Sequence, residues 1–174
     1  MVIWLVGLSG SGKTTIGKEV DRLWKAQAPN TVLVDGDDVR RMLGYDASPA
    51  DYTLAGRRRN AERIVEICAW LDRQNINVIC CILCLFEDIM RANRMRFSRY
   101  IQVHVDAPLH VLQERDPKGI YARAKSGAEK NVVGVDIPFP VPPESDLTLF
   151  TGVGAPSPLA HAQEILHVAG VSNE

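Results

Sequence analysis

Residues Gly7–Thr15 read GLSGSGKTT. They follow an apolar run, Val2–Val6, that is typical of a buried strand, and they open an amphipathic segment that is typical of a helix. A strand, a glycine-rich loop and a helix in this order form a phosphate-binding loop. The alternative is a glycine- and serine-rich turn with an exposed lysine. The fixed positions of the pattern G-x-x-x-x-G-K-[ST] are filled by Gly7, Gly12, Lys13 and Thr14.

Each residue type in this loop has a separate physical task. Glycine has no Cβ, so the backbone can curl and come close to a phosphate. Successive N–H groups point inward as an anion nest, and the helix that starts there adds its positive dipole end. Lys13 supplies a mobile cation for the outer phosphates, and the Thr14 hydroxyl can bind Mg²⁺. We therefore expect a nucleoside triphosphate to be held by Gly7, Ser9, Gly10, Ser11, Gly12, Lys13, Thr14 and Thr15.

The composition is that of an ordinary globular protein. The chain has 174 residues, of which 46% are hydrophobic and 24% charged, and we expect a single domain over residues 1–174. The formal net charge of -1 argues against a nucleic-acid partner. No apolar stretch has membrane-spanning length, and the run Val2–Val6 is too short for the core of a signal peptide. We therefore expect a cytoplasmic protein without a membrane partner.

Four cysteines are present, and three of them lie in one apolar run, NVICCILCLF. Cys81 and Cys84 have the C-x-x-C spacing of a redox or metal-binding pair. The sequence has no second pair of this kind and no histidine nearby, and alternation along a strand places the two side chains on opposite faces. We therefore expect the thiols to be reduced and packed in the core, at Cys68, Cys80, Cys81 and Cys84.

Apolar runs and amphipathic segments alternate along the chain without a repeat. This alternation predicts a three-layer α/β fold with a parallel sheet of about five strands. The expected strands are Val2–Val6, Thr31–Val34, Val78–Leu83, Tyr100–Val105 and Asp146–Phe150. The expected helices cover residues 13–27, 38–43, 54–74, 87–96 and 108–114, a short stretch ending at 125, and 158–168. The stretch Gly127–Pro143 holds two glycines and four prolines, so we expect a lid at about 115–143.

Two carboxylates follow the second expected strand, in the sequence Asp35-Gly36-Asp37. Ligands of open parallel sheets bind at the carboxyl ends of the strands, where the phosphate-binding loop also lies. Such a pair can hold a metal-bound water or accept a hydroxyl proton, and the third strand offers no carboxylate for the metal. The alternative is an Asx turn that closes the strand. Beside a phosphate-binding loop we favour function, with Lys13, Asp35 and Asp37 catalytic and Thr14, Asp35 and Asp37 at the metal.

Basic side chains recur at helical spacing in the first half of the chain. Arg40 follows Asp37 by about one helical turn, so both project on one side. Arg57, Asn60 and Arg63 share one face of the long helix. Arginines with an asparagine between them suit an anionic nucleotide, and arginines at a helix start oppose the helix dipole unless an anion is bound. The alternative is a solvated basic helix start.

A second group of cations follows the fourth expected strand, in the sequence RDPKGIYAR that begins at Arg115. Lys118 and Arg123 can close over phosphates as part of a lid. Phosphoryl transfer needs such a cover, because the enzyme mainly positions groups and neutralises spread negative charge.

Taken together, these motifs resemble the adenylyl-sulfate (APS) kinases over nearly the whole chain. The resemblance implies a P-loop kinase fold, ATP with Mg²⁺, transfer to the ribose 3′-hydroxyl of adenylyl sulfate, and a homodimer. It implies that Asp37 is the metal-linked acid or base with Asp35 as its partner, and that Arg115 and Lys118 bind nucleotide. It also implies substrate binding by Arg40, Arg57 and Asn60. The matching pieces are GLSGSGKTT, VDGDDVR (34–40), Arg57 with Asn60, RDPKGIYARAKSG (115–127), and G-V-D with a following proline (134–138).

The acceptor side departs from the family pattern. Val132-Val133-Gly134 stands where members read F-T-G. Valine has no aromatic face on which a base can stack, and the loss of such a stacking contact costs about 1–3 kcal/mol. Glu87 replaces an arginine in the family's I-S-P-Y-R, and Glu62 replaces another arginine. Tyr52 supplies an aromatic side chain where members have a phenylalanine. The acceptor-side candidates are Tyr52, Glu87, Lys118, Val132, Val133 and Gly134.

This altered pattern is similar to a divergent branch, the cytidine diphosphoramidate kinases of capsule biosynthesis, on the phrase NVVGVDIPF at residues 131–139. A smaller base needs less stacking surface, and an end that carries a neutral amide needs fewer arginines. The two acceptors stay open, as do other nucleotides of this shape. A non-catalytic ATP-binding module is disfavoured by the intact Asp35–Asp37 pair, and a GTPase-type switch by the lack of an N-K-x-D-like motif.

Overall fold

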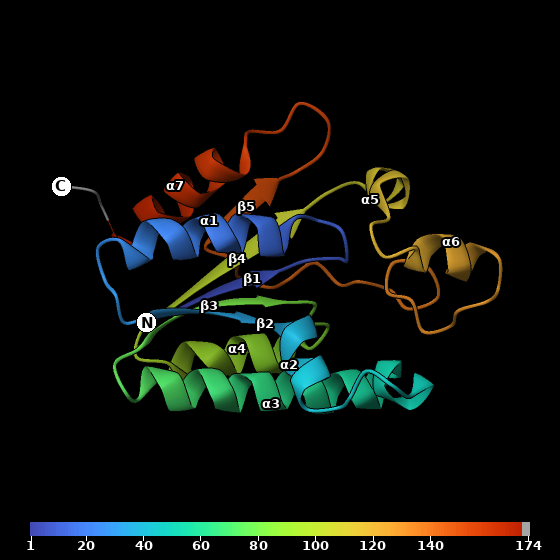
Figure 1. The fold of residues 1–174 in the computed structure, drawn as a ribbon, viewed down its shortest axis with the longest axis horizontal. Helices are drawn as coiled ribbons and strands as arrows, with labels where there is room; N and C mark the ends of the chain where they lie inside the picture. The colour runs from blue at the N-terminus through green and yellow to red at the C-terminus, as the bar shows by residue number, and fades with distance from the viewer. Residues whose placement is uncertain (172–174) are drawn as a thin grey trace.

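The computed structural model describes residues 1–171. Its centre is a sheet of five parallel strands in the order β2-β3-β1-β4-β5, which confirms the predicted α/β fold (Figure 1). The central strand β1 is fully buried, because helices cover both faces of the sheet. The strands are β1 (Val2–Val6), β2 (Thr31–Asp35), β3 (Asn77–Ile82), β4 (Tyr100–Asp106) and β5 (Leu147–Phe150).

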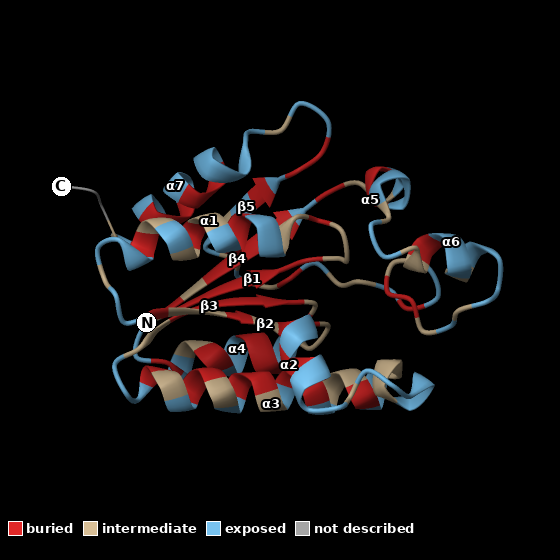
Figure 2. Cartoon of the chain, in the orientation of Figure 1, coloured by how far each residue is buried: buried red, intermediate tan, exposed pale blue. Residues whose placement is uncertain are grey.

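Two helical layers cover the sheet, α1 and α7 on one face and α2, α3 and α4 on the other (Figures 1 and 2). Ile3 and Leu5 of β1 pack with α1 and α7 in one core, and Trp4 packs with α3 and α4 in the other. Within residues 1–171, no helix is both long and apolar enough to cross a bilayer. The helices are α1 (Lys13–Lys25), α2 (Gly36–Met42), α3 (Leu54–Asp72), α4 (Glu87–Arg96), α5 (Leu109–Arg115), α6 (Ile120–Lys125) and α7 (Pro158–Val168), with one 3₁₀ turn, η1 (Pro49–Tyr52).

The element boundaries lie within two residues of the expected ones, and the largest differences have local causes. Helix α2 begins at Gly36 instead of residue 38, because the Asp35 carboxylate accepts a hydrogen bond from the Asp37 N–H (2.9 Å) and caps the helix. Between α2 and α3 the chain forms η1, whose first turn is capped by the Ser48 side chain.

The four cysteines are buried and carry free thiols, as expected for core residues. Cys81 packs in the core beneath α1 and α7. Cys84 lies beyond the end of β3 and packs in the opposite core with α3 and α4. The two thiols of the C-x-x-C spacing therefore face different layers, as the alternation along the strand predicted.

The chain leaves the sheet between β4 and β5, and residues 107–146 are called here the β4–β5 segment. It carries α5 and α6, which lie beside the sheet at the carboxyl ends of the strands (Figure 1). A separate apolar cluster holds the segment against the phosphate-binding loop. Its members are Ala107, Leu112, Tyr121 and Val132, packed with Leu8 of the loop.

Replacing Gly7 by alanine should destabilise the fold, because a Cβ at this position would lie 2.3 Å from the Val105 carbonyl oxygen. Backbone of β4 cannot yield as a flexible side chain can, so we expect a loss of about 2–4 kcal/mol in the free energy of unfolding. Gly44→Ala is the matched control: Gly44 has φ +70° and open space around it, so only the conformational cost of about 1–2 kcal/mol remains. Urea unfolding measures both, and equal losses would contradict the steric account.

Candidate active site

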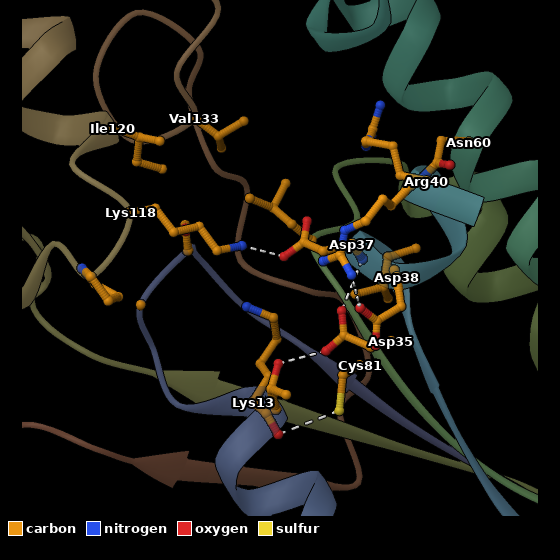
Figure 3. A pocket seen from close by; sticks show the side chains of 18 of the residues that line it. Lys13, Asp35, Asp37, Asp38, Arg40, Asn60, Cys81, Lys118, Ile120 and Val133 are labelled. Atoms are coloured by element: carbon orange, nitrogen blue, oxygen red, sulfur yellow. Dashed lines mark hydrogen bonds and ion pairs between the residues drawn. The ribbon is translucent and has the colours of Figure 1, made fainter. Parts of the chain in front are cut away.

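A pocket of about 700 Å³ lies at the carboxyl ends of β1, β2 and β3. Its walls come from the phosphate-binding loop with the start of α1, the end of β2 with α2, the start of α3, and the β4–β5 segment (Figure 3). Seven lysines and arginines but only four carboxylates line it. This surplus of positive charge favours an anionic ligand.

The phosphate-binding loop has the backbone that its glycines predict. Gly10 and Gly12 have φ of +78° and +95°, a left-handed conformation that only glycine adopts without strain. Helix α1 begins at the next residue, Lys13, so its first N–H groups and its dipole point toward the pocket. The Lys13 ammonium donates to the Leu8 carbonyl at 2.6 Å.

Desolvation, with a smaller contribution from the nearby Lys118 charge, lowers the pKa of Lys13 to about 8, against the opposing effects of Cys81 and the two aspartates. The ammonium is half-buried in the base of the pocket. A dianionic phosphate placed there restores the charged form. Lys13 is therefore a cation whose charge depends on the ligand it meets.

Binding of ATP should weaken as the pH rises through 8. The free protein loses the Lys13 proton near that pH, whereas a phosphate-bound lysine keeps it, so binding above pH 8 takes up a proton. The Kd should then rise by about tenfold per pH unit until the pKa of the bound state is reached. Calorimetry in buffers of different ionisation enthalpy measures both the Kd and the proton uptake. In the Lys13→Met variant the Kd for ATP should no longer depend on pH in this way. A wild-type Kd that is constant from pH 7.5 to 9.5 would contradict the role of the Lys13 proton.

Thr14 and Asp35 meet at the mouth of the loop. The Thr14 hydroxyl donates to Asp35 Oδ2 at 2.6 Å, while Asp35 Oδ1 caps α2. Asp35 is thus both the helix cap that the Asx alternative described and a carboxylate of the pocket. Hydroxyl and carboxylate oxygens are ligands that fit Mg²⁺, which binds through one or two protein groups and the substrate phosphates. Within residues 1–171, no group of three or more histidine, cysteine, aspartate or glutamate side chains is placed to hold a metal ion.

Asp37 faces Lys118 across the pocket (Figure 3). The two residues lie 81 positions apart, and their side chains form an ion pair. Desolvation within the pocket acts to raise the pKa of Asp37, although its side chain is exposed, but the hydrogen bond and charge of Lys118 outweigh this effect, so the pKa lies below its usual value. Asp37 is therefore ionised at neutral pH and can accept a hydrogen bond from a hydroxyl group.

The two arginines expected at the substrate also bind the protein's own backbone. Arg40 is buried and donates to the carbonyls of Tyr45 (3.2 Å) and Asp51 (2.8 Å). Arg57 donates to the Tyr52 carbonyl (2.9 Å) and to the Asn131 carbonyl (2.8 Å), which comes from the β4–β5 segment. Both guanidinium groups also lie near the Tyr52 ring, at 4.9 and 5.7 Å from its centre. These arginines shape the acceptor end of the pocket as well as charging it.

Asn60 lies on the next turn of α3 and is 4% exposed. Its Oδ1 has no hydrogen-bond partner among the described residues, although the side chain lines the pocket (Figure 3). Two other arginines of this helix contact residues outside the pocket. Arg58 pairs with Asp88 at 2.9 Å, and Arg63 stacks on Tyr45 with its charge 3.8 Å from the ring centre. Arg63 does not line the pocket, so of the expected row only Arg57 and Asn60 do.

Most of the residues expected at the site line this one pocket. They are Ser9, Gly10, Gly12, Lys13, Thr14, Thr15, Asp35, Asp37, Arg40, Tyr52, Arg57, Asn60, Lys118, Val132 and Val133.

Five expected residues do not line the pocket. Gly7 and Ser11 belong to the phosphate-binding loop but are buried. Arg115 donates to the Thr151 carbonyl at 2.5 Å. Gly134 packs near the side chain of Leu8. Glu87, expected near the acceptor, is exposed in the first turn of α4, where its nearest cation is Arg91 at 4.0 Å, one helical turn away. The Glu87 carboxylate therefore lies outside the pocket in which the other acceptor-side candidates Tyr52, Lys118, Val132 and Val133 meet.

Other residues that line the pocket were not predicted from the sequence. Asp38 and Arg41 pair at 3.0 Å on α2, and their helical spacing from Asp35 and Asp37 was the available signal. Glu129, which pairs with Arg123 at 2.7 Å, had no local signal, because the fold of the β4–β5 segment brings it to the pocket.

The sequence profile of the adenylylsulphate kinase family matches residues 1–150. The chain belongs to this family. It is therefore a phosphotransferase that uses ATP as donor and a hydroxyl group as acceptor.

Relatives of this family member differ in length and in name. The bifunctional enzyme NodQ of Azospirillum brasilense is 35% identical over 98% of the chain, but the chain spans only 28% of NodQ. The cytidine diphosphoramidate kinase of Campylobacter jejuni is 37% identical over 85% of the chain and 84% of its own length. Among solved structures, the Mycobacterium tuberculosis APS kinase CysC in complex with AMPPNP and APS has a TM-score of 0.84 at 27% identity, covering 97% of this chain and 96% of that one.

Proposed function

We propose that this adenylylsulphate kinase family member transfers the γ-phosphate of ATP to the ribose 3′-hydroxyl of a nucleotide. The observation that carries the proposal is the meeting of three elements in one pocket: the Lys13 ammonium, the Thr14–Asp35 pair, and the Asp37–Lys118 pair. The first two suit the phosphates of the donor, and the third faces the space where an acceptor hydroxyl would lie.

On the donor side, the N–H groups at the start of α1 hold the phosphates of ATP and Lys13 neutralises them. Lys13 must leave the Leu8 carbonyl to do so, and the gain in charge pairing with phosphate exceeds the loss of that one neutral acceptor. Thr14 and Asp35 would hold Mg²⁺, which would supply further positive charge to offset that of the phosphates.

On the acceptor side, Asp37 orients the attacking hydroxyl and takes its proton as the new O–P bond forms. Its low pKa makes it a weak base, which suits a loose transition state in which the proton moves late. Lys118, which pairs with Asp37 in the free protein, is free to turn to the transferring phosphate once the hydroxyl donates to Asp37. The β4–β5 segment, including the stretch 115–143, acts as the lid that excludes water from this step.

Adenylyl sulfate is one candidate acceptor, supported by the family and by the likeness to the CysC complex. Cytidine diphosphoramidate is the second, and two observations favour it. The walls supplied by Val132 and Val133 are aliphatic and offer no stacking surface for adenine. The relative from Campylobacter jejuni bears that substrate's name at 37% identity.

A coupled ADP-release assay with ATP, Mg²⁺ and each nucleotide in turn tests the proposal, and phosphorus NMR of the product locates the new phosphate. We expect turnover with one of the two nucleotides and a phosphate on the ribose 3′-oxygen. If neither nucleotide accepts phosphate, even in a single turnover with labelled ATP, the kinase proposal fails for this class of acceptor. Binding of ATP without any transfer would favour the non-catalytic module.

We further propose, from the family resemblance, a homodimer that works in the cytoplasm. Dependence on ATP and four free thiols suit a reducing, ATP-containing compartment. Light scattering coupled to size-exclusion chromatography measures the mass directly, and a value near 19.2 kDa would exclude the dimer.

A further inference from the structure

The part of the β4–β5 segment that reaches the pocket is a compact loop over residues 131–137. Val132, Val133 and Ile137 are buried there although none lies in a helix or strand. The loop is closed by its own backbone: the Val132 carbonyl accepts the N–H of residues 135 and 136 at 3.1 Å each, and Gly134 donates to Ile137 at 2.7 Å. A short bridge pairs Val133 with Ile137.

One exposed carboxylate organises this loop. Asp136 accepts the Asn131 N–H at 2.6 Å and the Val132 N–H at 2.5 Å, one with each oxygen. Hydrogen bonds from backbone N–H groups to an ionised carboxylate are stronger than neutral ones. Asn131 itself has a left-handed backbone conformation (φ +62°), which asparagine adopts more readily than most residues with a side chain.

The loop reaches the pocket through a second contact. The Asn131 carbonyl accepts from Arg57 Nη2 at 2.8 Å, and Arg57 Nε donates to the Tyr52 carbonyl at 2.9 Å. Arg57, Tyr52 and Val132 all line the pocket, whereas Asp136 does not. A continuous chain of hydrogen bonds therefore runs from Asp136 through Asn131 to Arg57.

We propose that Asp136 is a positioning residue for the acceptor nucleotide: it fixes the Val132–Val133 wall and, through the Asn131 carbonyl, the Arg57 guanidinium. The inference rests on the proposed function, because the acceptor is taken to bind between that wall and α3. Asp136 has no such role toward ATP in this proposal, because the phosphates of ATP lie at Lys13 and the start of α1. Loss of the Asp136 charge should therefore affect the acceptor and leave the donor almost unchanged.

Asp136→Asn tests this with an isosteric change that leaves only one acceptor oxygen. Using whichever of adenylyl sulfate or cytidine diphosphoramidate the wild type phosphorylates, we expect the acceptor KM to rise about tenfold, consistent with the loss of one charge-assisted hydrogen bond. The KM for ATP and kcat should each change by less than about threefold. Glu114→Gln, an equal charge change at an exposed position of α5, should alter none of these values. A parallel rise of both KM values, or an unchanged acceptor KM, would overturn the proposal.

Two further readouts separate positioning from plain destabilisation of the segment. Arg57→Lys should raise the acceptor KM as well, and the double variant should be less than additive, because both changes break one chain of contacts. In the free protein, Asp136→Asn should speed amide exchange at residues 131 and 132 by about tenfold, and unchanged exchange would contradict the hydrogen bonds. This exchange needs no substrate. Inactivity of the wild type on both nucleotides would therefore count against the proposed function, while exchange still decides whether Asp136 holds the loop.

Discussion

Replacing Lys13 by methionine should lower kcat by about a thousandfold, because it removes the cation that neutralises the outer phosphates in the transition state. Methionine has nearly the same length and fills the half-buried space, so the fold should survive. The released Leu8 carbonyl, which accepts from Lys13 in the free protein, can bind water. Steady-state ADP release at saturating ATP and acceptor measures the loss.

Lys25→Met is the matched control for that variant. Lys25 lies in the last turn of the same helix. Among the described residues its one ion pair is with Asp21 on the surface, at 3.1 Å. Its removal should change kcat by less than about twofold, since an exposed pair of this kind contributes little. If Lys13→Met kept kcat within tenfold of the wild type, the phosphate-binding loop would have no direct part in the chemistry.

Asp37→Asn should lower kcat by about a hundred- to a thousandfold while the KM for ATP changes little. The amide keeps the shape of the side chain but cannot take the hydroxyl proton, and it no longer forms an ion pair with Lys118. Circular dichroism and thermal unfolding should remain close to those of the wild type, because Asp37 is exposed and caps no helix.

Asp46→Asn provides the same charge change at an exposed position outside the pocket, and it should leave kcat unaffected. The pair of variants thus separates a specific role of the Asp37 carboxylate from a general change in the field of the site. A kcat within fivefold of the wild type in Asp37→Asn would exclude this residue as the proton acceptor, and Asp35 would become the candidate.

The fold and the donor half of the site followed from local sequence. The strand, loop and helix around Gly7–Thr15 are contiguous, so their pattern alone predicts the geometry that Gly12 and Lys13 adopt. Asp35 and Asp37 were also predictable, because a parallel sheet brings the ends of its strands to one edge. The sequence could not show that Asp35 has two roles at once: one carboxylate oxygen caps α2, and the other accepts from Thr14.

The acceptor half depended on contacts between distant parts of the chain. Helical spacing placed Arg57 and Arg63 on one face of α3, but it could not say which turn reaches the pocket and which packs on Tyr45. Glu87 was aligned with a substrate-side arginine, yet the first turn of α4 points it elsewhere. The contact between Arg57 and Asn131 joins residues 74 positions apart in a loop without regular structure, where no periodic pattern carries information.

The small cluster between Leu8 and the β4–β5 segment has an energetic consequence. Tyr121 also donates to the Ser9 carbonyl at 2.9 Å, so the phosphate-binding loop and the segment are ordered together. A phosphate that stiffens the loop lowers the entropy still to be lost when the segment closes on an acceptor, and the converse holds equally. We therefore expect the two nucleotides to share one coupling free energy through this contact, so that each changes the affinity of the other by the same factor.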